Sequence, residues 1–193
     1  VLVFDLTFLT PRGLHGEIGL LSAICVYTRF VWLRPIWGET ARDCAYALFA
    51  VICDSGVAAA KLLSDRDSKF RKAVVLELTS LFNSKQGFSM AYSPESHGDV
   101  ERVHVEIHRI IGKTIENLGS AQGVLWPLFV PLVELVWRSK TLESGESPMA
   151  LSRGYFATTP LQTALGAISS IPEGLAHTTM ARALLAAHRL IMR

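Results

Sequence analysis

Residues 91–113 read AYSPESHGDVERVHVEIHRIIGK, and this stretch decides how the rest of the chain is interpreted. A short strand is expected to end at Tyr92, after which Pro94 and Gly98 interrupt the backbone. A helix should then begin with Glu101 in its first turn. Loops that join a strand end to a helix start are where α/β folds usually hold their chemistry. Glu101 is therefore a candidate catalytic carboxylate.

Two earlier acidic residues are candidate partners of Glu101. Asp5 lies inside the apolar run VLVFDLTFL, and Asp65 lies in the segment LLSDRDSKF, with 35 residues between Asp65 and Glu101. An unpaired carboxylate is costly to bury, so an Asp within an apolar strand suggests a function. Taken alone, Asp65 is explained as well by a helix N-cap, and Glu101 by the favourable helix dipole.

The remaining pattern predicts an α/β domain. Runs of apolar and β-branched residues indicate strands at 1–10, 19–27, 30–36, 57–64 and 88–92. Helical periodicity indicates helices at 40–56, 70–82, 98–118, 126–139 and 147–151. This order fits an RNase H-like mixed five-stranded sheet, with three antiparallel strands first and helices on both faces. A C-terminal helical tail is expected after it.

Composition and length indicate one folded domain with a tail. Half of the 193 residues are hydrophobic, and 19 basic against 17 acidic residues give a net charge of +2, which by itself indicates no particular partner. We expect a core at 1–155 and a helical C-terminal extension at 156–193. The chain starts inside a strand-like run, so an N-terminally truncated fragment of a longer product is expected. No apolar run is long enough to span a bilayer, so no membrane partner is expected.

Together, these motifs resemble the DD(35)E catalytic core of retroviral and gypsy-type LTR-retrotransposon integrases. The resemblance rests on Asp5, on SDR-x-SKF around Asp65, and on YSP-x-S-x-G-x-VER leading to Glu101. The segment SPMALSRGY at 147–155 is similar to the closing SP-x-x-L-x-x-GR of that core. The SDR-x-SKF and VER-x-H motifs are closer to the gypsy type. The resemblance implies a polynucleotidyl transferase and endonuclease that processes 3′ ends and transfers retroelement DNA into target DNA.

The resemblance also implies a two-metal site for Mg²⁺ or Mn²⁺. In the family the first Asp bridges both metals, the second Asp binds one and the Glu binds the other, so these roles fall on Asp5, Asp65 and Glu101. Such hard cations prefer carboxylates and water, and a pair of them suits phosphodiester exchange. No small-molecule cofactor is expected.

Residues around the acids are expected to contact DNA. The resemblance implies DNA contacts for Tyr92, Ser68 and His97, and for the helical His108. Arg66 and Lys69 belong to a basic cluster next to Asp65 that could attract the phosphate backbone, although each charge is also an ordinary solvated one. The six positions are Tyr92, His97, Ser68, His108, Arg66 and Lys69. The expected partners are element-end DNA, target DNA and further copies of the chain, with the nucleus as the expected location.

Three residues depart from the usual pattern of the family. Asp67 replaces a usual Gly, Glu95 replaces a usually neutral residue, and Val105 stands where Lys or another polar residue is frequent. These departures favour the alternative interpretation, a decayed or co-opted non-catalytic module for DNA binding or assembly. A nuclease acting on RNA–DNA hybrids would share the fold and the metals, but the YSP-x-S-x-G and SP-x-x-L segments give it no support.

His104 and His108 form an i, i+4 pair whose spacing suits zinc. No third ligand or H-E-x-x-H glutamate is visible beside them in the sequence. Surface histidines on a DNA-facing helix are therefore the preferred interpretation, with zinc as the alternative.

Overall fold

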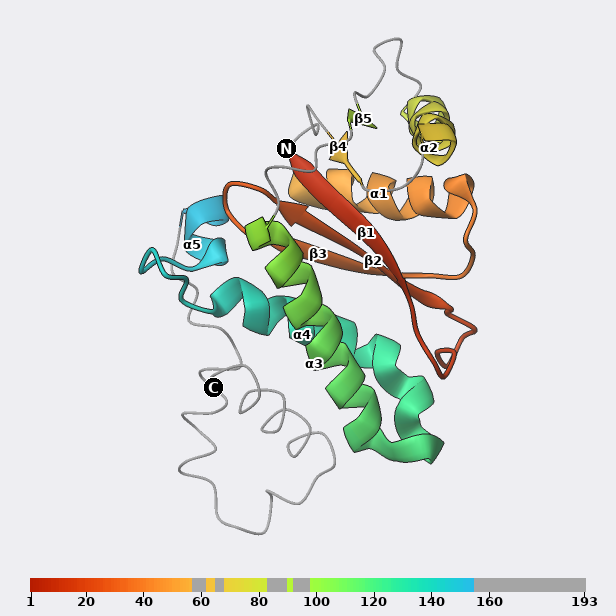
Figure 1. The fold of residues 1–193 in the computed structure, drawn as a ribbon, viewed down its shortest axis with the longest axis vertical. Helices are drawn as coiled ribbons and strands as arrows, with labels where there is room; N and C mark the ends of the chain where they lie inside the picture. Colours follow the sequence, from red (N-terminus) through yellow and green to blue (C-terminus); the bar gives the residue numbers. More distant parts are fainter. Residues whose placement is uncertain (57–61, 65–67, 83–89, 92–97, 155–193) are drawn as a thin grey trace.

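The computed structural model describes residues 1–56, 62–64, 68–82, 90–91 and 98–154 (Figure 1). Five strands and five α-helices lie in this part of the chain, with one short 3₁₀ turn, η1 (Gly123–Leu125). The strands are β1 (Leu2–Phe8), β2 (Gly19–Cys25), β3 (Val31–Ile36), β4 (Leu62–Leu63) and β5 (Met90–Ala91). The helices are α1 (Ala41–Ser55), α2 (Ser68–Leu81), α3 (Gly98–Gln122), α4 (Trp126–Ser139) and α5 (Pro148–Arg153).

The strands form one mixed sheet in the order β3-β2-β1-β4-β5. β1 pairs antiparallel with β2, and β2 antiparallel with β3, whereas β4 pairs parallel with β1 and β5 parallel with β4. β1 is therefore the central strand. The predicted mixed sheet with three antiparallel strands first is confirmed. The expected helical tail after residue 155 lies outside the described residues.

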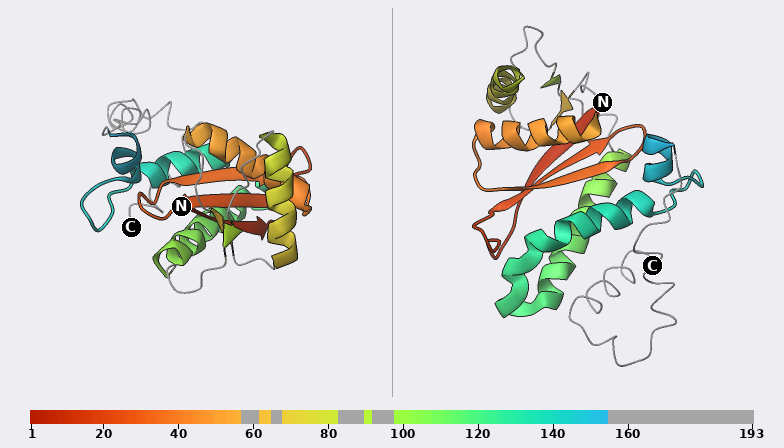
Figure 2. Two further views of the ribbon diagram at one scale, coloured as in Figure 1. Left: turned by 90° about the horizontal axis from the view of Figure 1, so that it is seen from above. Right: turned by 180° about the vertical axis from the view of Figure 1, so that it is seen from behind.

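Helices cover both faces of the sheet (Figure 2). One buried cluster joins the sheet to α1 and α2, and it includes Leu2, Phe4 and Leu6 of β1. The opposite cluster joins the sheet to α3 and α4, and it includes Val3 of β1. Because successive side chains of a strand point to opposite faces, Asp5 belongs to the face of Val3. The central strand therefore presents Asp5 toward the side of the sheet that α3 and α4 cover.

Local sequence signals set most helix boundaries. Thr40 and Asp43 form a capping box at the start of α1, and Gly56 ends that helix in a left-handed conformation with φ of 66°. Ser147 caps α5. The range of α3 includes a kink at Gly119, whose φ of 72° and ψ of 172° are non-helical, so the continuous helix ends at the predicted residue 118 and a short helical segment follows. α4 has the predicted bounds.

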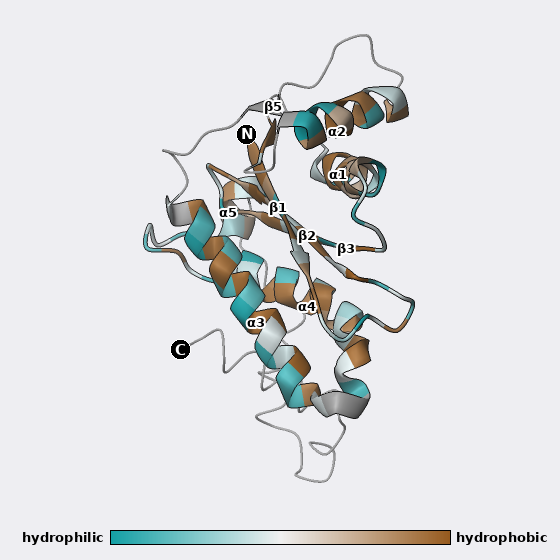
Figure 3. Ribbon diagram, turned by 45° about the vertical axis from the view of Figure 1, so that its right-hand side comes forward, coloured by the Kyte–Doolittle hydropathy of each residue, from teal (hydrophilic) through white to brown (hydrophobic). Residues whose placement is uncertain are grey.

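The amphipathic pattern of α3 decides how it packs. Apolar and polar residues alternate along this helix, whereas the strands are mainly apolar (Figure 3). Val100, Val103, Ile107, Ile110 and Ile111 are buried against the sheet. Within the part of the chain that the structure describes, no helix is long and apolar enough to cross a membrane.

Glu134, on α4, is buried and bridges that helix to β3. Its carboxylate accepts hydrogen bonds from the backbone N–H of Leu33 and the guanidinium of Arg34, the latter at 2.9 Å. Arg138, one turn later on α4, lies 3.1 Å from the other carboxylate oxygen. Burial raises the pKa of Glu134, and the two arginines oppose that shift. This network fixes α4 on the sheet face that also carries α3.

Candidate active site

Asp5 lies near the middle of the central strand and is partly buried. One of its carboxylate oxygens, Oδ1, accepts a hydrogen bond of 2.7 Å from the backbone N–H of Leu6. Its partner in the antiparallel register is Ser22 of β2. The apolar strand thus carries a carboxylate on the face covered by α3, at the position the sequence indicated.

His104 packs against Asp5 and Ser22 from α3. The hydroxyl oxygen of Ser22 lies 2.8 Å from Nδ1 of His104 and 3.5 Å from the backbone oxygen of Asp5. His104 is only 7% exposed, and its other ring nitrogen, Nε2, is buried without a hydrogen-bond partner among the described residues. Burial and the neighbouring His108 lower the pKa of His104 to about 4. This side chain is therefore neutral at pH 7.

His108 lies one turn further along α3 and is half-buried. Its Nε2 atom is 2.6 Å from the hydroxyl oxygen of Thr7, which belongs to β1. Burial lowers the pKa of His108, and the negative charge of Asp5 opposes that shift. Two neighbouring α3 histidines are thus each held by a hydroxyl of the sheet.

Asp5, His104 and His108 form one group of possible metal ligands. One ligand atom from each of the three side chains lies within 4.8 Å of the others. The interpretation of His104 as a surface histidine is wrong, because the side chain is buried against the sheet. The sequence also suggested no third ligand, but Asp5 supplies one. Asp5 and His104 are 99 positions apart in the sequence, so only the packing of α3 on β1 reveals the group.

Glu101 occupies the first turn of α3, where it is exposed. It precedes His104 by one helical turn, but it is not part of the group of ligand atoms just described. Asp65 lies outside the described residues. β4 pairs with β1 so that Leu63 is opposite Val3, and in the sequence Asp65 follows Leu63 by two positions, as Asp5 follows Val3. The convergence of the three acids stays a prediction.

The expected DNA contacts are described only in part. Tyr92, His97 and Arg66 lie outside the described residues, as do Asp67 and Glu95. Ser68 is the first residue of α2, and Lys69 beside it is exposed. Val105, four positions after Glu101, is 65% exposed. The position that departs from the family pattern therefore presents an apolar side chain to solvent.

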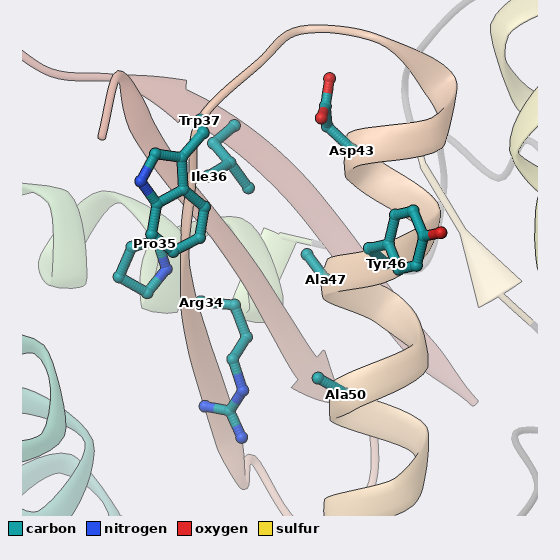
Figure 4. Close-up of a pocket in the computed structure, with 8 residues that line it drawn as sticks. All are labelled: Arg34, Pro35, Ile36, Trp37, Asp43, Tyr46, Ala47 and Ala50. Carbon is teal, nitrogen blue, oxygen red and sulfur yellow. The ribbon is translucent and has the colours of Figure 1, made fainter. Parts of the chain in front are cut away.

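A separate hollow of about 410 Å³ lies between β3 and α1, lined by side chains that include Trp37 and Tyr46 (Figure 4). Its charged groups already have structural partners. Asp43 belongs to the cap of α1, and Arg34 pairs with Asp54 and Glu134. This hollow thus offers apolar surface but no uncommitted charged group among the residues that line it.

Comparisons with known proteins point to retroviral sequences and to one fold. No family model matches the chain. It is 26% identical over 148 residues to the Pro-Pol polyprotein of simian foamy virus type 3 (strain LK3), covering 76% of this chain and 12% of that protein. It is 29% identical over 102 residues to the Pro-Pol polyprotein of feline foamy virus, covering 52% of this chain and 9% of that protein. The chain thus spans about a tenth of the length of these relatives.

The solved structures include a match to the catalytic core domain of BIV integrase. The TM-score is 0.57 at 18% sequence identity, and the match covers 79% of this chain and 93% of that one. At this identity the likeness concerns the fold. It supports the predicted integrase-core fold.

Proposed function

We propose that this chain is a retroviral integrase core domain that carries out metal-dependent 3′-end processing and strand transfer of retroelement DNA into target DNA. The core is proposed to comprise residues 1–155. The observation that carries the proposal is the position of Asp5, a partly buried carboxylate on the central strand of this fold, on the sheet face covered by the helix whose first turn carries Glu101.

The residues fit a site for hard divalent cations. Carboxylates are the protein ligands that Mg²⁺ and Mn²⁺ prefer, and Asp5 and Glu101 supply two, with Asp65 proposed as the third. When bound, a metal pair would activate the attacking oxygen and stabilise the leaving oxygen. Asp5 would hold its side of the site from a rigid strand, which keeps the carboxylate in place before DNA arrives.

The surrounding side chains would then position the DNA. Lys69, which is exposed at the start of α2, supplies a positive charge for the phosphate backbone. Tyr92, His97, Ser68, His108 and Arg66 are proposed to add contacts around the acids. We further propose that several copies of the chain assemble on the DNA ends.

A nicking assay tests the proposed activity. The purified 193-residue chain would be incubated with a labelled duplex oligonucleotide and Mn²⁺ or Mg²⁺. We expect metal-dependent nicking that falls about a hundredfold or more in Asp65→Asn and in Glu101→Gln, since each removes a proposed ligand of a metal ion that would stabilise charge in the transition state. Glu116→Gln is the matched control, because Glu116 is also exposed on α3 but lies four turns further on. Equal nicking by the wild type and Asp65→Asn would contradict the proposal.

The exposed Val105 favours a second candidate function, a DNA-binding or assembly module without catalysis. Thermal unfolding separates the two candidates. A working carboxylate site is stabilised by Mn²⁺, because the ion binds the folded chain better than the unfolded one, and this response should disappear in Glu101→Gln. A chain that binds DNA but gains no stability from Mn²⁺ fits the second candidate.

A further inference from the structure

The three-residue group of Asp5, His104 and His108 offers a different ligand chemistry from a set of carboxylates. Two imidazoles and one carboxylate suit borderline transition metals such as Zn²⁺, whereas Mg²⁺ prefers oxygen ligands. One ligand atom from each residue lies within 4.8 Å of the others. Ligands of one tetrahedral zinc are roughly 3.3 Å apart, given bond lengths of about 2.0–2.1 Å. The separation of up to 4.8 Å is thus about 1.5 Å wider than this spacing, so binding one ion would draw the three side chains closer together.

The environment of His104 matches that of a zinc-binding histidine. Such a histidine usually hydrogen-bonds through one ring nitrogen and binds the metal through the other. In this chain Nδ1 of His104 contacts the Ser22 hydroxyl at 2.8 Å, while Nε2 is buried and has no hydrogen-bond partner in the part of the chain that the structure describes. A buried polar atom without a partner is rare in folded proteins. A metal ion would satisfy this nitrogen.

His108 has a comparable arrangement. Its ring is held by the Thr7 hydroxyl, with the 2.6 Å contact made by Nε2. The two imidazole rings belong to consecutive turns of α3, and their centroids are 6.2 Å apart. Asp5 approaches from β1, so the helix and the strand together enclose the position of the ion.

We propose that Asp5, His104 and His108 form a binding site for Zn²⁺, with Ser22 and Thr7 orienting the two imidazoles. Zn²⁺ binding at this site does not depend on DNA cleavage, so the proposal holds even if the chain has no nuclease activity. Since Asp5 is also one of the carboxylates proposed for Mg²⁺, Zn²⁺ and Mg²⁺ compete for that residue. This last consequence rests on the proposed function.

Direct metal binding tests the proposal. Zn²⁺ would be titrated calorimetrically into the metal-free 193-residue chain, and Co²⁺ would be added as a spectroscopic probe of histidine ligation. We expect saturable Zn²⁺ binding that weakens at least about tenfold in His104→Asn and in His108→Gln. Asn retains a polar group near Nδ1 for Ser22 but removes the Nε2 ligand. Ser22→Ala, which removes only the orienting hydroxyl, should weaken binding by roughly 10- to 100-fold.

His15→Asn is the matched control, because His15 is exposed and makes only backbone contacts among the described residues. Circular dichroism of each variant checks that it is folded. Should His104→Asn not fold, His108→Gln and Asp5→Asn decide the matter. Absence of saturable Zn²⁺ binding, or unchanged binding in the folded ligand variants, overturns the proposal. Zn²⁺ binding without Mg²⁺-dependent nicking supports this site and counts against the proposed enzyme. Mg²⁺-dependent nicking without Zn²⁺ binding supports the proposed enzyme and counts against this site.

Discussion

The hydroxyl of Ser22 lies 2.8 Å from Nδ1 of His104 and so joins β2 to α3 across the face of the sheet that carries Asp5. Both residues are buried. A hydrogen bond between buried groups matters chiefly because losing one partner leaves the other unsatisfied. This contact therefore contributes both to stability and to the orientation of the imidazole beside Asp5.

Replacing Ser22 with Ala should lower the free energy of unfolding by about 1–3 kcal/mol, the usual cost of an unsatisfied buried polar group. Urea unfolding at pH 7 in the presence of a chelator measures the effect. Ser139→Ala is the control, since among the described residues the Ser139 hydroxyl bonds only the preceding helical turn, and a change within about 0.5 kcal/mol is expected there. A Ser22→Ala variant as stable as the wild type would show that the contact does not hold α3.

The pH dependence of stability should report the buried His104. Its pKa in the folded chain is lowered from 6.5 to about 4, so the unfolded chain takes up the proton first as the pH falls. Stability of the metal-free chain should therefore decline as the pH falls from about 6.5 to 4, by at most about 3 kcal/mol from this residue. His108 titrates beside it, so the comparison with His104→Asn is decisive. The decline should be shallower in that variant, and parallel curves would contradict the assignment.

Glu134 should be the most sensitive charged residue of α4. Removing its carboxylate in Glu134→Ala leaves the Leu33 N–H without its acceptor and Arg34 and Arg138 without their shared anion. Breaking a buried ion pair in this way typically costs about 3–5 kcal/mol. Glu134→Gln retains an acceptor and should cost less. Urea unfolding measures both, with Glu116→Ala as the exposed control, and a cost for Glu134→Ala no larger than that of the control would refute the prediction.

Local sequence signals were sufficient to predict most elements of the fold. Thr40 and Gly56 mark the ends of α1 because a cap depends on a few neighbouring residues. The bounds of α4 follow from its apolar periodicity in the same way. The continuous part of α3 ends at the predicted Leu118, because Gly119 is non-helical, but the short helical segment that follows this kink was not predicted. A glycine signals conformational freedom but does not specify how it is used.

Tertiary contacts were predicted less completely than local structure. Asp5 was recognised as unusual because it is a charge within an apolar strand, but its neighbours His104 and Ser22 come from other elements. The burial of Glu134 was missed for a related reason. The pairing with Arg138 can be inferred from its position four residues later in the sequence. The Leu33 N–H, from which the carboxylate accepts a hydrogen bond, belongs to a distant strand. Only the sheet register and the helix packing bring such groups together.

Val105 offers a direct test of whether α3 contacts DNA. This side chain is 65% exposed, four positions after the proposed catalytic Glu101, and carries no charge. Val105→Lys should tighten DNA binding at low salt, because each added phosphate contact releases counterions and steepens the logarithmic salt dependence by about 0.9 for B-form DNA. Binding measured by fluorescence anisotropy over a range of salt concentrations gives this slope.

The matched control is Leu128→Lys, which adds the same charge at a residue of α4 that is 63% exposed. A purely global effect of net charge would change the salt dependence of DNA binding equally in both variants. A local contact on α3 should steepen the slope only in Val105→Lys, since a lysine acts on a phosphate within about a Debye length, roughly 10 Å at 0.1 M salt. Equal slopes in the two variants would therefore mean that this face of α3 does not lie against the DNA.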